Sequence, residues 1–453
     1  MRNLLEQHRA YYRSGNTRDA RMRVEALRKL QTTMKRRETA LLRAIAADLS
    51  KAPEEAYMME LGIVYSELRY AIRHLRRWGR PRFALPSIGQ LPGHGRVLRD
   101  PYGVVLILAP WNYPIQLTLV PLIAAVAAGN CAVVRPSSSA PRTAKVIAAI
   151  LEESFTSGHV SAVLGESSVA AELTALPFDK IFFTGSPSVG REVMRAASAN
   201  LVPVSLELGG KSPAVVAADA NIKLAARRIV WGKFVNAGQT CVAPDYVLVN
   251  RKVEKQLLEA MRDEVARQYG RDPVHNPDLA AIVSDRHFAR LSNMLGDGRL
   301  VCGGQTDPDT RKIAPTILTG VAEDDPLMRD EIFGPILPVI TFKTMEEAMT
   351  SVRSRPHPLA FYLFTEDQDA ARRVMRDMTF GGGCVNDTVL HVASNRLPFG
   401  GVGNSGMGVY HGKYGYECFS REKGIFMAST RMDVPVRYPP WQGKMKILKQ
   451  IMK

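Results

Sequence analysis

From residue 104 onward, short apolar runs alternate with helical stretches, and this alternation restricts the fold more than any other feature of the chain. The runs are apolar at successive positions, which indicates strands that are buried on both faces. Helices between such strands predict parallel, doubly wound sheets of the α/β class. The runs form two series, which predicts two α/β domains. The first series is 104–109, 131–134, 162–164 and 181–183, and the second is 214–216, 247–249, 313–318, 336–341 and 359–364.

The length of the chain also calls for more than one core. At 453 residues it exceeds the limit of roughly 250 to 300 residues for a single hydrophobic core. Residues 17–80 are expected to be helical, because Leu27, Leu30 and Met34 recur at helical spacing with charged residues between them. The Pro- and Gly-rich stretch that follows, from residue 79 to residue 95, marks a boundary or an excursion of the chain.

The charge balance and the cysteines argue against several classes of protein. Sixty Lys and Arg residues against 44 Asp and Glu residues give a net charge of +16, which raises the possibility of a polyanionic partner. The basic residues are spread along the chain without a helix-turn-helix or RNP-like signature, so no specific nucleic-acid partner is expected. The five widely spaced cysteines include no C-x-x-C pair and signal neither a metal site nor a disulfide framework.

The N-terminal segment has no apolar signal core. Its first fifty residues are Arg-rich, but Glu6, Asp19 and Glu25 are unusual in a mitochondrial presequence. No apolar run approaches the roughly 18 residues that a membrane span needs. We therefore expect a cytoplasmic protein.

Cys241 is the strongest candidate for a reactive residue. It lies in the run Q-T-C-V-A-P, and Glu207 lies 34 positions upstream in L-E-L-G-G-K. A thiol at the end of a helical segment and a carboxylate at a strand end suit a nucleophile that is served by a general base. A lone cysteine is more often a buried structural residue, but the surrounding residues favour catalysis.

These runs resemble motifs of the aldehyde dehydrogenase superfamily, and three further motifs occur in the family's order. They are P-W-N-Y-P at 110–114, E-I-F-G-P at 331–335 and L-P-F-G-G-V-G-N-S-G-M-G at 397–408. The resemblance covers about residues 10 to 440. The run Q-T-C-V-A-P-D-Y at 239–246 is similar to that of the class 3 branch. The resemblance implies NAD(P)-dependent oxidation of a medium- or long-chain aliphatic or aromatic aldehyde to the acid.

The resemblance also assigns catalytic roles. Cys241 would attack the aldehyde to give a thiohemiacetal and then a thioester, and Asn112 would stabilise the oxyanion. Glu207 would activate the hydrolytic water, although Glu331 could share this function. The substrate pocket is expected to include three further residues, namely Tyr113, Thr240 and Phe399.

NAD or NADP is the cofactor that the resemblance implies. A strand-to-helix turn at 183–190 is expected to meet the phosphates, and Glu331 and Phe333 to hold the nicotinamide ribose. The family's K-P-S-E run reads Arg135-Pro136-Ser137-Ser138 here, and this loss of a carboxylate near a retained cation predicts substantial use of NADP. The expected contacts are Trp111, Arg135, Ser138, Thr184, Gly185, Ser186, Gly190, Leu208, Gly209, Glu331 and Phe333.

The class 3 resemblance supplies domain boundaries and an oligomeric state. It implies a cofactor domain at 1–81 and 102–206 and a catalytic domain at 207–423, whose last part returns towards the cofactor domain. It also implies a bridging β-sheet at 82–101 and 424–440 that joins two subunits as a homodimer. The basic tail, 441–453, is expected to be solvated or to contact anionic lipid weakly.

Two other functions remain open at this point. A CoA-acylating aldehyde dehydrogenase would pass the same thioester to a thiol, whereas Glu207 favours water as the acceptor. A catalytically idle structural protein on the same fold is disfavoured by the presence of Cys241, Glu207 and Asn112.

Overall fold

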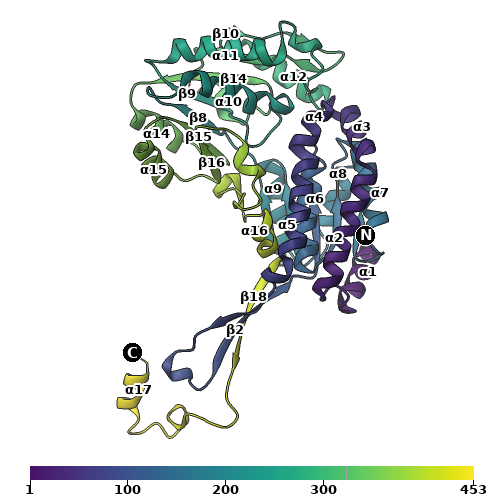
Figure 1. The fold of residues 1–453 in the computed structure, drawn as a ribbon, viewed down its shortest axis with the longest axis vertical. Coiled ribbons are helices and arrows are strands. Elements are labelled where there is room, and N and C mark those ends of the chain that lie inside the picture. The colour runs from purple at the N-terminus through teal and green to yellow at the C-terminus, as the bar shows by residue number, and fades with distance from the viewer. Residues whose placement is uncertain (323, 453) are drawn as a thin grey trace.

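The computed structural model describes residues 1–322 and 324–452. It contains two α/β bodies, a column of N-terminal helices beside one of them, and an arm that projects away from both (Figure 1). In the described part of the chain, no helix is at once long and apolar enough to cross a bilayer. The N-terminal helices are α1 (Arg2–Arg13), α2 (Ala20–Arg36), α3 (Glu38–Leu49), α4 (Pro53–Ala56), the π-helix η1 (Tyr57–Leu61) and α5 (Gly62–Trp78).

The first body is built on a six-stranded sheet of order β17-β7-β6-β3-β4-β5. Five strands are parallel, and the short β17 (Gly406–Met407) returns from late in the chain to pair antiparallel with β7. Every residue of β3, β4 and β6 is buried, as continuous apolar runs require. Its other strands and helices are β3 (Val104–Leu108), α6 (Gln116–Ala128), β4 (Cys131–Arg135), α7 (Pro141–Ser154), β5 (Val160–Ala162), α8 (Ser167–Thr174), β6 (Lys180–Thr184), α9 (Pro187–Ser198) and β7 (Val204–Glu207).

The second body contains a seven-stranded sheet of order β10-β13-β14-β9-β8-β15-β16, in which only β10 is antiparallel. A small hairpin, β11 (Thr306–Asp307) and β12 (Lys312–Ile313), lies outside this sheet. The strands are β8 (Pro213–Val216), β9 (Tyr246–Asn250), β10 (Arg299–Cys302), β13 (Thr316–Thr319), β14 (Ile336–Phe342), β15 (Ala360–Phe364) and β16 (Gly382–Val385). The helices are α10 (Ile222–Phe234), α11 (Glu254–Tyr269), α12 (Asp285–Asn293), α13 (Pro326–Arg329), α14 (Met345–Arg353) and α15 (Gln368–Asp377). The helix α16 (Gly412–Cys418) instead packs against α5 and α6, on the side of the first body (Figure 1).

The α/β fold class with doubly wound parallel sheets is confirmed, and two strand predictions need correction. The run 162–164 was expected to be a strand, but β5 ends at Ala162. The run 313–318 was expected to be one strand. Instead Ile313 belongs to the hairpin and β13 begins at Thr316, and Ala314 and Pro315 between them belong to neither strand. The apolar pattern of the sequence did not indicate this interruption.

The arm is a three-stranded antiparallel sheet of β1 (Arg82–Ala84), β2 (His94–Pro101) and β18 (Ser420–Met427). The expected second segment, 424–440, is therefore displaced: the strand begins at Ser420 and ends at Met427. It follows α16 directly, and β2 offers eight partner residues from His94 to Pro101. The chain then reaches the last helix, α17 (Met445–Ile451), near the far end of the arm (Figure 1). Lys453, which belongs to the predicted basic tail, lies outside the described residues.

Candidate active site

A cleft of about 560 Å³ lies between the two bodies, and its walls come from both. Trp111 and Asn112 follow β3, Thr184 ends β6 and Glu207 ends β7, whereas Cys241 and Glu331 belong to the second body. In the first sheet the chain passes from β3 to β4 on one side and later to β6 on the other. The cleft therefore lies at the carboxyl ends of parallel strands, at the point where the strand order reverses, which is where ligands bind in open α/β sheets.

Cys241 is delivered by a loop with unusual backbone geometry. After α10 the chain passes through Asn236 and Ala237, whose φ angles are +53° and +51°. Gly238 follows at φ +74°, and a Cβ there would lie 2.3 Å from the carbonyl oxygen of Gly334. This glycine therefore allows the nucleophile loop to pack directly on the backbone of the E-I-F-G-P run.

Two carboxyl groups share the cleft with the thiol. Burial raises the pKa of the Cys241 thiol, and the nearby carboxylates of Glu331 and Glu207 raise it further. Glu207 is 2% exposed, and neither of its oxygens has a hydrogen-bond partner in the protein. Burial also raises the pKa of Glu207 well above its ordinary value. A carboxyl group with a raised pKa is a stronger base once ionised, which suits proton abstraction near neutral pH.

Glu331 is held in a different environment. Its Oε2 lies 2.0 Å from the point where a Cβ on Gly209 would be, so any side chain at position 209 would displace the carboxylate. Burial, and to a smaller degree Asp245, raises the pKa of Glu331, while a hydrogen bond from the Gly210 amide opposes the shift. The Asp245 carboxylate accepts from the Ile332 amide at 3.1 Å and from Lys211 Nζ at 2.6 Å. These contacts brace the E-I-F loop beside the thiol.

Aromatic rings line the same cleft as Cys241. The Trp111 ring packs edge to face on Phe333 at 5.5 Å and on His287 at 5.7 Å. Phe333 has a φ of +51°, a backbone conformation that a bulky residue adopts only when its surroundings enforce it.

The cleft residues fit a dinucleotide. Thr184 Oγ1 is buried without a protein partner, and α9 begins immediately after Ser186, which caps it by accepting from the Val189 amide. The first turn of a helix attracts phosphate through its free amides and its dipole. At Gly185 a Cβ would lie 2.5 Å from the Phe183 ring, so the backbone is left bare for close approach.

Several predicted site residues do not line this cleft. Tyr113, expected in the substrate pocket, is 5% exposed and its hydroxyl contacts Thr240 Oγ1 at 2.6 Å behind the nucleophile loop. Phe399 is buried in a bridge with Tyr410, where the two backbones exchange hydrogen bonds. Gly190 is likewise set back: a Cβ on it would lie 2.7 Å from Leu208, so its small size lets α9 approach that residue.

Arg135, the last residue of β4, and Ser138, three positions after it, also lie outside the cleft. Arg135 Nη2 donates to the Gly165 carbonyl at 2.9 Å and to Ser138 Oγ at 3.3 Å. Burial lowers the pKa of Arg135, and the carboxylate of Glu166 opposes this shift. One nitrogen of the guanidinium is thus hydrogen-bonded within the protein, and the carboxylate of Glu166 lies close to the group.

The cleft contains residues that the motifs did not single out. Lys211 is part of L-E-L-G-G-K and could have been named from that run, whereas His287 and Arg290 on α12 carry no sequence signal. Other unpredicted lining residues are Pro110, Leu117, Pro187, Ser188, Arg191, Gly210, Arg329, Asp330, Pro356, His357 and Asn404. Across the described residues, no group of three or more His, Cys, Asp or Glu side chains is placed to bind a metal ion.

A model of the aldehyde dehydrogenase family matches residues 3–425. The chain belongs to the aldehyde dehydrogenase family. It is 44% identical to 4,4'-diaponeurosporen-aldehyde dehydrogenase of Staphylococcus aureus, over all of both chains. It is also 40% identical to aldehyde dehydrogenase family 3 member B1 of Mus musculus, over 97% of this chain and 94% of the relative. A structure of Staphylococcus aureus AldH in a substrate-bound state superposes with a TM-score of 0.97 at 43% identity, covering 100% and 99% of the two chains.

These findings confirm the predicted class 3 resemblance and the oxidoreductase activity. The chain is an NAD(P)-dependent aldehyde dehydrogenase, and the CoA-acylating and idle alternatives are disfavoured.

Proposed function

We propose that this enzyme oxidises apolar aldehydes to carboxylic acids through a thioester on Cys241. The observation that carries the proposal is the convergence of Cys241, Glu207 and Asn112 on one cleft. As a thiolate, Cys241 adds to the aldehyde carbon and makes it tetrahedral. The side-chain amide of Asn112 and the backbone amide of Cys241 stabilise the oxygen that becomes negative, and one such donor is worth about 2.7 to 4 kcal/mol.

Glu331, Phe333 and Trp111 would hold the nicotinamide half of the cofactor, and Leu208 and Gly209 line the same cleft. The bound cofactor would supply the hydride acceptor that lets the carbon attached to Cys241 become a thioester. Thr184, Gly185 and Ser186 would hold the diphosphate at the start of α9.

Hydrolysis of the thioester requires a base, and we assign this role to Glu207. Its two oxygens have no protein partner, so they are free to accept a proton from water, whereas Glu331 is already bound by the Gly210 amide. Release of the carboxylic acid returns Cys241 to its thiol form. In the test, the Glu207→Gln variant is mixed with aldehyde and NAD and release of NADH is followed. A single burst supports the assignment, and an unchanged steady-state rate moves the base role to Glu331.

We also propose that the enzyme uses NADP as well as NAD. Ser138 removes the carboxylate that would repel a 2′-phosphate, and Arg135 keeps a cation on the same segment. Two features oppose the proposal: the Arg135 guanidinium is bound to the Gly165 carbonyl, and Glu166 stands nearby to accept from a ribose hydroxyl.

The substrate class proposed is medium- to long-chain aliphatic or aromatic aldehydes. The 44% identical Staphylococcus aureus relative is named for a diaponeurosporen aldehyde, which supports a large apolar substrate here. Comparing kcat/KM for a series from acetaldehyde to a long-chain aldehyde tests this. A preference for the shortest member would contradict it.

A homodimer formed through the arm and a cytoplasmic location are further proposals. The arm exposes apolar side chains, and a protruding apolar sheet suits a second copy of the chain. Sedimentation of the full chain tests the dimer. The exposed apolar residues are Phe83, Leu85, Ile88, Leu91, Ile425, Phe426 and Met427.

The basic tail is proposed to contact anionic lipid weakly. In α17, Met445, Leu448 and Ile451 share one face and Lys446 and Lys449 lie away from it, an amphipathic arrangement in a helix too short to bind firmly. Vesicle sedimentation of the full chain against a form ending at Gly443 tests the contact. Equal partitioning would be the negative result.

A further inference from the structure

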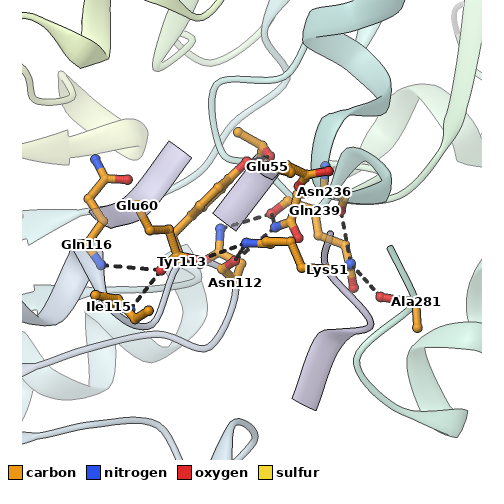
Figure 2. Close-up of polar contacts among 11 residues, drawn as sticks. Lys51, Glu55, Glu60, Asn112, Tyr113, Ile115, Gln116, Asn236, Gln239 and Ala281 are labelled. Atoms are coloured by element: carbon orange, nitrogen blue, oxygen red, sulfur yellow. Dashed lines mark hydrogen bonds and ion pairs between the residues drawn. The ribbon is translucent and has the colours of Figure 1, made fainter. Parts of the chain in front are cut away.

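A buried ion pair lies behind the oxyanion loop and takes no part in the reaction described above. Lys51 and Glu60 are 1% and 0% exposed, and Lys51 Nζ donates to Glu60 Oε1 at 2.8 Å. Lys51 lies in the turn between α3 and α4, and Glu60 lies in the π-helix η1. Burial of a charged pair is costly unless its remaining hydrogen-bonding capacity is satisfied. The groups that hydrogen-bond to Lys51 and Glu60 therefore indicate which part of the protein the pair stabilises (Figure 2).

The lysine is fully engaged, and two of its contacts are with the P-W-N-Y-P loop. An ammonium group has three hydrogens to donate. Besides Glu60, Lys51 Nζ donates to the backbone oxygen of Asn112 at 3.2 Å and lies 4.3 Å from the centre of the Tyr113 ring. Lys51 thus binds the backbone of Asn112, whose side chain is assigned to stabilise the oxyanion.

Glu60 holds the other end of the same loop. Its Oε2 accepts from the amides of Ile115 at 2.8 Å and Gln116 at 3.3 Å. These amides begin α6, which receives no cap from the side chain of its own N-cap residue. A carboxylate is favourable at this end of a helix. The pair therefore fixes the loop at both ends, from residue 112 to residue 116.

The opposite side of Asn112 is held by the nucleophile loop. The backbone oxygen of Asn112 also accepts from Asn236 Nδ2 at 2.9 Å, and Asn112 Nδ2 donates to the Gln239 carbonyl at 3.0 Å. The backbone amide of Asn236 in turn donates to Glu55 Oε1 at 3.0 Å. Asn112 is thus clamped between the N-terminal helices and the loop that carries Cys241, with one side-chain amide hydrogen left for the substrate oxygen.

We infer that Lys51 and Glu60 are positioning residues that hold the Asn112 amide in place for the developing oxyanion. The inference rests on the proposed role of Asn112. A donor stabilises a transition state without further cost only when it is oriented in advance, and a displacement of about 1 Å reduces rate by roughly a hundredfold. Neither charge needs to touch the substrate.

The first test separates positioning from stability. Lys51→Met and Glu60→Gln each leave a buried charge without its partner and should lower Tm. The double variant Lys51→Met/Glu60→Gln removes both charges and keeps an acceptor for the Ile115 amide, so its Tm should recover. Its kcat should nevertheless stay at least tenfold below wild type, because the Asn112 carbonyl lacks its ammonium donor. KM for NAD should remain within about twofold. A kcat that recovers together with Tm would overturn the inference.

The second test is a double-mutant cycle with Asn112→Ala. If Lys51 and Glu60 act through Asn112, adding their double change to Asn112→Ala should lower kcat no further. An additive loss would mean that the pair acts elsewhere. Asn130→Ala is the matched control. Asn130 is fully buried just beyond the other end of α6, where it bonds Gly103, Ala125 and Phe419. This variant should lose Tm while keeping kcat.

The same series separates failure of the inference from failure of the proposed function. A wild-type enzyme without aldehyde-dependent NADH formation would refute the function itself. An Asn112→Ala variant with wild-type kcat would refute the oxyanion role. A strong effect of Asn112→Ala beside a wild-type rate for the Lys51→Met/Glu60→Gln variant would refute only the inference.

Discussion

Replacing Glu207 should make the protein more stable and less active at once. Glu207 is 2% exposed and both of its oxygens lack protein partners. A buried polar group without a partner costs about 1 to 3 kcal/mol. Glu207→Leu removes that cost with little change in volume, so the variant should gain about 2 kcal/mol. An unfolding entropy of ~2.1 cal/mol/K per residue over the 453 residues of the chain converts this gain to a rise in Tm of about 2 °C.

The gain in stability should depend on pH. Burial raises the pKa of Glu207 in the folded protein above its ordinary value of 4.5. Below about pH 4.5 the carboxyl is protonated in both the folded and the unfolded state, and its contribution is then constant. As pH rises the unfolded chain ionises first, so wild type loses stability by up to about 1.4 kcal/mol per pH unit. The advantage of Glu207→Leu should therefore grow between pH 5 and pH 8.

Thermal unfolding of wild type and Glu207→Leu at pH 5, 6, 7 and 8 measures both the rise in Tm and its dependence on pH. Glu207→Gln supplies the kinetic side: one NADH per active site should appear in a burst, followed by a steady-state rate reduced by at least about a hundredfold, the lower end of the range for loss of a general base. A Tm that falls in the leucine variant, or a difference that does not change with pH, would refute the reasoning about the unpartnered carboxyl.

Three further predictions concern the thiol, the cofactor and a second carboxyl group. Cys241→Ala should abolish turnover yet bind NADH with unchanged affinity by fluorescence titration, and residual turnover would end the thioester mechanism. The ratio of kcat/KM for NAD and NADP should lie within about a hundredfold, equivalent to ~2.7 kcal/mol, and a larger preference for NAD would show that Ser138 does not govern selectivity. Burial raises the pKa of Glu55 to about 7, so wild type should lose about 3 kcal/mol as pH rises from 4.5 to 7. Glu55→Gln should remove this loss, and equal pH profiles of urea unfolding for the two proteins would contradict it.

Local patterns were sufficient for most strands of the two α/β bodies and for the motifs that show the family. The strands β3 and β4 are buried on both faces, so each appears in the sequence as a continuous apolar run. Cys241, Glu207 and Glu331 each lie in a motif of a few residues, which can be read directly from the sequence.

Contacts between distant segments left no such trace. Lys51 stands in Ser-Lys-Ala-Pro-Glu-Glu, which reads as an exposed turn, yet its ammonium is buried against Asn112, 61 positions away. Tyr113 bonds Thr240 across 127 positions, a contact that the sequence did not indicate. Arg135 was expected to face the cofactor, and its guanidinium donates a hydrogen bond to the Gly165 carbonyl.

The sequence by itself determined the α/β class, most of the strands and the family of the chain, because each depends on short-range pattern. Only the tertiary structure decided what surrounds those residues. Burial, unpartnered oxygens and shifted pKa values arise when helices from the N-terminus pack against loops from both α/β bodies. The free energies of these effects depend on groups that folding brings together, and the spacing of residues along the chain does not encode those free energies.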